Sequence, residues 1–348
     1  MVTAGEVLPP ASGQAGWHCQ LTTLEGWRQF TADAPDVPEL LSGTARDGLP
    51  DDERSRYDER RLDYHTRLGV VATSTLRHVV NTGRRLTLLN RHAVSARRGL
   101  IVSGAAGTGK TTAITQLGKA HEATDRRRHP GSDRIPVVYV TVPPAATPRM
   151  LAVEFARFLG IPVMTRANIT DVIEAVCGVM TDTRTTVVCV DEIHNLKLAT
   201  RNGAEVSDTL KYFSERIPAT FVYAGISVER EGLFAGTRGQ QIAGRFTMVP
   251  AAPFPYAAEW QGLVATLEDA LRLHGHPAGT LTGLDRYLHQ RTGGMIGSLS
   301  HLIRGAAIEA LLDGSEKITR TLLDAVDLDH AAQARPVPPR PAAAKRTA

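Results

Sequence analysis

Hydrophobic and polar positions follow two different patterns along the chain, and the change falls near residue 99. Before it, residues 17–98 have mainly helical spacing, and a Thr73 cap precedes the apolar positions Leu76, Val79 and Val80. From residue 99, short apolar runs alternate with helical stretches, and the candidate strands are residues 100–103, 136–142, 186–190 and 220–224. This alternation predicts an α/β fold, a parallel sheet covered by helices.

The pattern changes again after Pro255, where the strand-like runs stop and apolar residues recur at helical spacing. We therefore predict a small helical lid over residues 256–330, after an α/β core over 99–255 and a helical N-terminal extension over 17–98. The two ends, residues 1–16 and the basic Pro/Ala-rich tail 331–348, have compositions that disfavour a packed core, and we expect both to be disordered.

Composition adds limits rather than a function. The net charge of +4 equals the four basic residues of the acid-free tail, so bulk charge gives no argument for nucleic-acid binding. The three cysteines are odd in number and lack the spacing of metal ligands, which favours a reducing cytoplasm over a disulfide framework or a zinc site. No export signal or membrane-spanning run is evident, and we expect a cytoplasmic protein without a membrane anchor.

A phosphate-binding loop follows the first candidate strand and precedes a helical stretch. Its glycines let backbone N–H groups surround the phosphates of ATP, and the lysine reaches the β- and γ-phosphates. The first threonine after the lysine is expected to ligate Mg²⁺, and the second, Thr112, to support the loop. The loop consists of Gly104, Ala105, Ala106, Gly107, Thr108, Gly109, Lys110 and Thr111.

A second motif ends the third candidate strand, where the apolar run reaches Asp191 and Glu192. This is the pattern of a Walker B strand: Asp191 is expected to hold the Mg²⁺ shell, and Glu192 to orient and deprotonate the attacking water. The adjacent glutamate favours a hydrolase over a kinase. A strand inserted between the two motifs is a layout shared by AAA+ proteins, helicases and RecA relatives.

Further candidates depend on their position after these motifs. Ser227 follows the fourth candidate strand and is a candidate for sensor 1, with an ordinary turn serine as the alternative. Arg245 is our candidate for an arginine finger acting in trans, with a surface arginine in an ordinary ion pair as the alternative interpretation; Arg238 is the weaker candidate. Many AAA+ proteins carry a sensor 2 arginine where this chain has Gly297. We interpret Arg304, further along the same helical stretch, as a solvated surface residue.

Two segments remain ambiguous from the sequence. His194 and Asn195 follow the Walker B acids, where they are expected either to contact Glu192 or to form a structural turn. The run Arg126-Arg127-Arg128 is interpreted as a basic loop that meets DNA phosphates or as a solvated surface.

With these residues placed, the chain resembles the TniB/TnsC-type AAA+ ATPases that act beside a DDE transposase. The resemblance covers most of the chain and rests on the phosphate loop GAAGTGKTT, DEIHNL at 191–196, the strand from Pro136 leading to Val142-Pro143-Pro144, Gly244-Arg245-Phe246, and Tyr57-Asp58-Glu59-Arg60-Arg61 with Tyr64-His65 ahead of the core.

The resemblance implies a homo-oligomer that assembles on double-stranded DNA in its ATP state, marks target DNA, and recruits or stimulates the transposase. Hydrolysis is then expected to dismantle the assembly. Lys110, Thr111, Asp191, Glu192 and Arg245 carry over by matching position, whereas no motif fixes the DNA-contacting residues. A helicase loader or a signalling NTPase acting through protein partners is the alternative, although the C-terminal part is short for an added DNA-reading domain.

Overall fold

The computed structural model describes residues 7–8, 19–33, 36–164, 166–196, 201–229 and 244–328, with the backbone alone for 7–8 and 201–206. The chain divides into two compact units. The core unit comprises Leu8–Asp36 and Ala72–Ala252, and the lid unit comprises Met1–Val7, Val37–Val71 and Pro253–Ala348. Within the described ranges, no helix combines the length and apolarity needed to cross a membrane.

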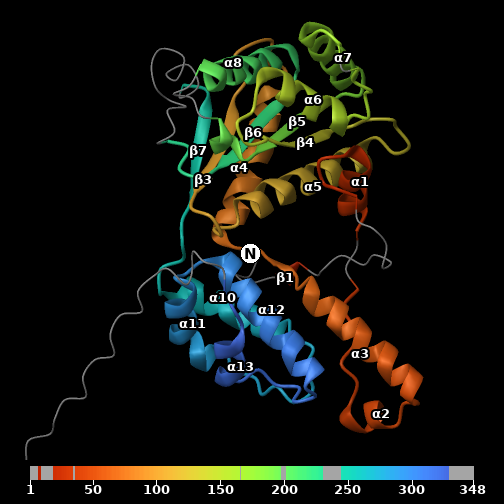
Figure 1. The fold of residues 1–348 in the computed structure, drawn as a ribbon, viewed down its shortest axis with the longest axis vertical. Helices are drawn as coiled ribbons and strands as arrows, with labels where there is room; N and C mark the ends of the chain where they lie inside the picture. The colour runs from red at the N-terminus through yellow and green to blue at the C-terminus, as the bar shows by residue number, and fades with distance from the viewer. Residues whose placement is uncertain are drawn as a thin grey trace, which may run out of the picture. The chain divides into compact units, whose positions relative to one another are not determined.

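A five-stranded parallel sheet forms the centre of the core unit, in the order β4-β5-β6-β3-β7 (Figure 1). Four of its strands confirm the predicted ones: β3 (Gly99–Gly104), β4 (Val137–Thr141), β5 (Val187–Asp191) and β6 (Thr220–Gly225). Nearly every residue of these strands is buried, as a sheet covered on both faces requires. The predicted α/β fold class is therefore confirmed.

The fifth strand, β7 (Phe246–Ala251), was not among the predicted strands. It lies at the edge of the sheet, where it pairs only with β3, and most of its residues are partly exposed, so it lacks a continuous apolar run. It also contains Pro250, which an edge strand tolerates because its missing N–H faces away from a partner.

Helices cover this sheet in two groups. The first contains α4 (Ser74–Asn90) and α5 (Lys110–Arg128), which pack on each other and on the strands, with α1 (Leu24–Ala32) against α5. The second contains α6 (Pro148–Phe158), α7 (Ile169–Asp182) and α8 (Arg201–Arg216), which lie on the other side of the strands from α5 and α1 in Figure 1. The predicted Thr73 cap of α4 is confirmed, since its hydroxyl accepts from the Leu76 N–H at 3.2 Å.

The lid unit has a hydrophobic core of its own. It contains α2 (Gly43–Asp47), α3 (Asp51–Thr66), α10 (Ala258–Asp269), η2 (Thr282–Leu284), α11 (Asp285–Thr292), α12 (Ile296–Leu312) and α13 (Arg320–Ala325). The short strand β2 (Val70–Val71) pairs with β1 (Val7–Leu8). The segment 17–98, predicted as one extension, is therefore divided between the two units; the predicted domain bounds stay predictions.

A buried ionic network joins α3 to the segment before α13. The Arg61 side chain is 0% exposed, and its two terminal nitrogens donate to the two oxygens of Glu316, each at 2.7 Å. Asp58 and Arg46 complete the network. Nearby, His65 donates from Nδ1 to the Arg61 carbonyl at 2.7 Å and accepts from the Arg272 N–H at Nε2, so it is held as one neutral tautomer.

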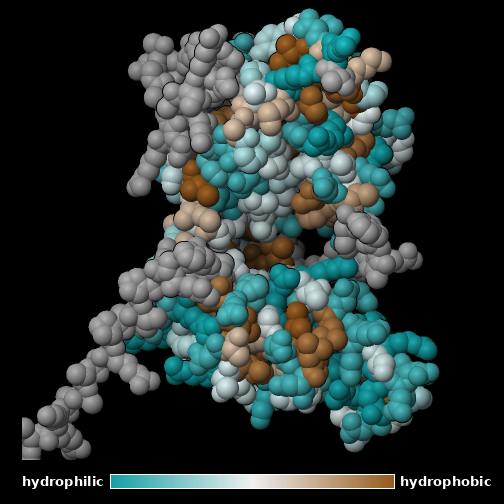
Figure 2. Space-filling model, viewed as in Figure 1, coloured by the Kyte–Doolittle hydropathy of each residue, from teal (hydrophilic) through white to brown (hydrophobic). Residues whose placement is uncertain are grey.

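Two interpretations of basic residues are wrong. Arg304 is not a solvated surface residue: it is partly buried, and its guanidinium donates to the carbonyls of His65 and Thr66 at the end of α3. The run 126–128 is not a loop but the last turn of α5, where positive charge is favourable beside the exposed carbonyls. In Figure 2 the visible surface of each unit is mainly hydrophilic, with smaller hydrophobic groups scattered over it.

Candidate nucleotide-binding site

The phosphate loop joins the carboxyl end of β3 to the first turn of α5, as predicted. Gly107 and Gly109 have φ angles of 76° and 84°, which other residues adopt only with strain, and Gly109 immediately precedes the helix. At Gly104 a β-carbon would lie 1.9 Å from the carbonyl oxygen of Ala251 in β7, so no larger residue fits there. The glycines are therefore required by the backbone itself.

Lys110 is positioned to serve the loop. Its side chain is almost completely buried, and its ammonium donates to the Ala105 carbonyl oxygen at 2.7 Å. Burial lowers the pKa of Lys110, while the carboxylates of Glu192 and Asp191 act in the opposite direction. The ammonium of Lys110 can exchange this neutral carbonyl acceptor for an anionic phosphate, to which its hydrogen bond would be stronger.

Asp191 is the centre of the polar cluster beside the loop. Its Oδ2 accepts from the Thr111 hydroxyl at 2.7 Å and from the Tyr139 hydroxyl at 2.9 Å, and its Oδ1 accepts from the Glu192 N–H at 2.8 Å. Burial and the neighbouring Asp191 carboxylate raise the pKa of Tyr139, which therefore stays a hydrogen-bond donor. Sequence reasoning missed Tyr139; its only signal was a polar tip inside an otherwise aliphatic strand.

Glu192 lies just beyond the end of β5, with a left-handed φ of 56°. Its Oε2 lies 3.3 Å from His194 Nε2, and His194 Nδ1 accepts from the Ile226 N–H at 3.3 Å. Because Nδ1 is an acceptor, a neutral His194 carries its proton on Nε2, and this N–H donates a hydrogen bond to the Glu192 carboxylate. Asn195 instead donates to the Val142 carbonyl at 2.8 Å and fixes the turn. The sequence left two alternatives open for these residues. Contact with Glu192 applies to His194, and a structural turn applies to Asn195.

Ser227 follows β6 at this same edge of the sheet, with a left-handed φ of 45°. The next residues are tied to β3, since Val228 donates its N–H to Ser103 Oγ at 2.9 Å and Ser103 donates to Glu229 at 2.5 Å. The structure thus brings the segment of Ser227 to the carboxyl edge that carries the loop, Asp191 and Glu192. Its role as sensor 1 stays a prediction.

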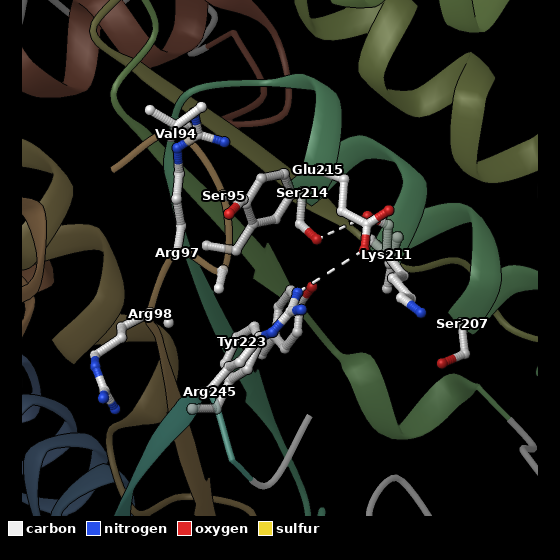
Figure 3. A pocket seen from close by; sticks show the side chains of 16 residues that line it. Val94, Ser95, Arg97, Arg98, Ser207, Lys211, Ser214, Glu215, Tyr223 and Arg245 are labelled. Atoms are coloured by element: carbon white, nitrogen blue, oxygen red, sulfur yellow. Dashed lines mark hydrogen bonds and ion pairs between the residues drawn. The ribbon is translucent and has the colours of Figure 1, made fainter. Parts of the chain in front are cut away.

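Arg245 lies at the opposite edge. It immediately precedes β7, whose first residue Phe246 is paired with Gly99 at the start of β3, whereas the phosphate loop begins at the far end of β3. Six residues of parallel strand span roughly 20 Å, too far for an arginine side chain to reach its own loop. Figure 3 shows Arg245 in a cavity of about 300 Å³, where it lies 3.8 Å from Glu215. Arg238 lies outside the described residues.

The oxygen donors of this cluster fit Mg²⁺. This ion is normally held by one or two carboxylates together with phosphate oxygens and water. Thr111 and Asp191 present a hydroxyl and a carboxylate that already touch each other, next to the loop. No cluster of three or more His, Cys, Asp or Glu side chains among the described residues offers an all-protein metal cage. The arrangement thus suits a cation shared with a phosphate ligand.

Comparison with known proteins agrees with this geometry. The family described as bacterial TniB protein matches residues 74–256, more than half of the chain. The chain belongs to this family. The TniB match includes the phosphate loop, the Walker B acids and Arg245, and the suspected family resemblance is confirmed. A search among curated proteins finds no match.

Solved structures extend the likeness of this TniB protein to the fold. The ORC1 protein of Aeropyrum pernix in complex with DNA is 16% identical, with 75% of this chain and 64% of that chain covered and a TM-score of 0.55. The ADP form of the ORC2 protein of Aeropyrum pernix is 16% identical, with coverages of 71% and 66% and a TM-score of 0.56. The chain spans less than two thirds of these proteins, and the likeness establishes the AAA+ P-loop fold.

Proposed function

We propose that this protein is an ATP- and Mg²⁺-dependent ATPase whose nucleotide state controls its assembly with further copies of itself on double-stranded DNA, and that the assembly recruits or activates a DDE transposase. Hydrolysis of ATP resets the assembly. The transposition role rests on membership of the TniB family. The ATPase role rests chiefly on one observation, the convergence of Thr111 and Tyr139 on one oxygen of Asp191 beside the loop.

In the proposed reaction the loop backbone, from Gly104 to Thr112, binds the phosphates, and Lys110 donates to the β- and γ-phosphates in place of Ala105. Thr111 and Asp191 would hold Mg²⁺, which would supply positive charge to offset that of the transferring phosphoryl group. Tyr139 keeps Asp191 oriented through its hydrogen bond.

Glu192 positions and deprotonates the attacking water in this reaction. Its contact with His194 holds the carboxylate beside the end of β6, where Ser227 is our candidate for reading the γ-phosphate. Arg245 stabilises the transition state in the site of a neighbouring copy, because the length of β3 separates it from its own loop. One copy alone is therefore an incomplete catalyst, which couples turnover to assembly.

Single-turnover hydrolysis and nucleotide binding, measured on the same preparations, test the proposed chemistry. Glu192→Gln is expected to bind ATP normally and to lose about 10² to 10⁴ in rate, the usual contribution of a general base. Lys110→Ala is expected to lose binding. Glu25→Gln, an exposed change on α1, is the matched control. Normal hydrolysis by Glu192→Gln contradicts the assignment of the base.

A strand-transfer assay addresses the partner. A purified DDE transposase is expected to give more transfer product when the wild-type protein and ATP are present than with Lys110→Ala. Equal product with both proteins contradicts the transposase part of the proposal while leaving the ATPase part intact.

A further inference from the structure

The core unit has a second cavity, of about 540 Å³, at the amino edge of its sheet. Helices α4 and α5 form its walls, and residues at the starts of β5 and β6, among them Thr186 and Thr220, form its floor. The phosphate loop lies at the carboxyl edge, so the two sites are separated by the length of the strands. The mechanism proposed above uses none of the residues that line this cavity.

The cavity has an excess of positive charge. Arg84 of α4, Arg91 at the C-cap of α4 and Arg128 of α5 line it, and within the described part of the chain none of their side chains has a hydrogen bond or an ion pair. A fourth arginine, Arg134, is neutralised by Asp125 at 3.3 Å. Three uncompensated guanidinium groups therefore surround one opening.

The floor is polar but already satisfied. His121 Nε2 lies 2.7 Å from the Thr186 hydroxyl, and Asn90 Nδ2 donates to the Thr220 hydroxyl at 2.9 Å. Burial lowers the pKa of His121, so this residue adds no charge at neutral pH. Ligand attraction is therefore concentrated in the three arginines at the rim.

What distinguishes these three arginines from isolated surface arginines is that they line one cavity. Arg126, on the same last turn of α5, has a partner, since it lies 2.6 Å from the buried Glu122 carboxylate. Arg85, next to Arg84 on α4, is also without a hydrogen bond or an ion pair among the described residues, but it does not line the cavity. The C-cap residue Arg91 keeps a right-handed helical backbone, so it follows Arg84 by about two helical turns on the same side, roughly 10 Å further along the axis of α4. Such spacing suits separate phosphate groups better than a single one.

We propose that this cavity is a second anion site, which binds a ligand carrying several phosphate groups in series through Arg84, Arg91 and Arg128. Guanidinium groups suit such a ligand because each can donate two parallel hydrogen bonds to one phosphate. The same chemistry is offered by free polyphosphate and by the backbone of duplex DNA. The polyphosphate source is independent of the proposed function, whereas the duplex source rests on its DNA association.

Binding to the triple variant Arg84→Gln/Arg91→Gln/Arg128→Gln tests the site. The phosphate loop is kept occupied throughout, by saturating ADP·Mg²⁺ for the polyphosphate probe and by a saturating non-hydrolysable ATP analogue with Mg²⁺ for the duplex probe. Titration calorimetry follows sodium tripolyphosphate, and fluorescence anisotropy follows a labelled short duplex over a range of salt concentrations. The matched control removes the same charge from exposed arginines of the core unit that do not line the cavity: Arg28→Gln/Arg85→Gln/Arg127→Gln.

If free polyphosphate is the ligand, the cavity variant binds tripolyphosphate about 10³-fold more weakly than the control, as expected for three lost charge-assisted hydrogen bonds. If duplex is the ligand, the slope of log K against log salt falls by about 2.7 for three lost phosphate contacts. Between 50 and 200 mM salt this slope corresponds to about a 40-fold difference.

Equal binding of both probes by the cavity variant and the control overturns the second site. Binding of a fluorescent ATP analogue, measured in parallel without ADP, reports on the phosphate loop alone. Loss of that signal in the wild-type protein counts against the proposed function and not against the cavity, so the two failures can be told apart.

Discussion

Removing Arg61 should destabilise the lid unit selectively. In Arg61→Ala the Glu316 carboxylate, only 7% exposed, loses both of its 2.7 Å contacts. Breaking a buried ion pair from one side costs about 3 to 5 kcal/mol. Glu316 keeps the His274 N–H at 3.0 Å and Arg46 at 3.3 Å, which places the expected loss near the lower end, about 3 kcal/mol.

Hydrogen exchange followed by mass spectrometry measures this loss in each unit separately, which a single melting curve of a two-unit chain does not. Amides of α3 and α12 are expected to exchange about 10²-fold faster in Arg61→Ala, the factor that corresponds to 3 kcal/mol, while those of α5 are unchanged. Arg56→Ala, exposed on the same helix, is the matched control. Equal exchange in α3 and α12 of the two variants would refute the reasoning.

Three further outcomes follow from individual contacts. Burial lowers the pKa of His65 to about 4. Between pH 6.5 and 4, this histidine is therefore protonated in the unfolded chain but neutral in the folded one. The free energy of unfolding is at its full value above this pH range and falls by roughly 3 kcal/mol as the pH drops through it. Urea titrations at several pH values should show this dependence weakened in His65→Gln. Tyr139→Phe removes one donor to Asp191 and is expected to reduce the rate of hydrolysis about tenfold with the fold unchanged by circular dichroism; an unchanged rate contradicts the role of the hydroxyl. Gly118→Ala places a methyl group 2.6 Å from the ring of Trp27, and a loss of about 1 to 3 kcal/mol is expected in urea unfolding followed by Trp fluorescence, whereas no loss would show that the ring can move aside.

The sequence predicted the parts of the fold that depend on local pattern. Four buried strands are continuous apolar runs, and each agrees with the structure within one residue at either end. The phosphate loop and the Walker B acids come together because both follow parallel strands of one sheet, so their chemistry could be predicted from spacing alone. By contrast, β7 has an edge pattern without a continuous run, and it was missed.

Contacts between distant segments could not be predicted in the same way. The Tyr139 hydroxyl reaches Asp191 because β4 and β5 pair with Thr141 opposite Asp191, a register that no local pattern specifies. Likewise, the many charged residues of α3 suggest an exposed helix. Arg61 is nevertheless completely buried, because Glu316, 255 positions away, neutralises its charge. Such pairs depend on tertiary packing and not on the propensity of either residue.

In the proposed function, the nucleotide state controls assembly through a residue supplied by a neighbouring copy. Sedimentation combined with electron microscopy of the protein with duplex DNA, in ATP·Mg²⁺, a non-hydrolysable analogue and ADP, measures this control. We expect ordered oligomers on DNA in the triphosphate states only, and their loss or slower hydrolysis in Arg245→Ala despite normal ATP binding. Nucleotide binding without DNA association in any state, or the same assembly in ADP as in ATP, would contradict the account.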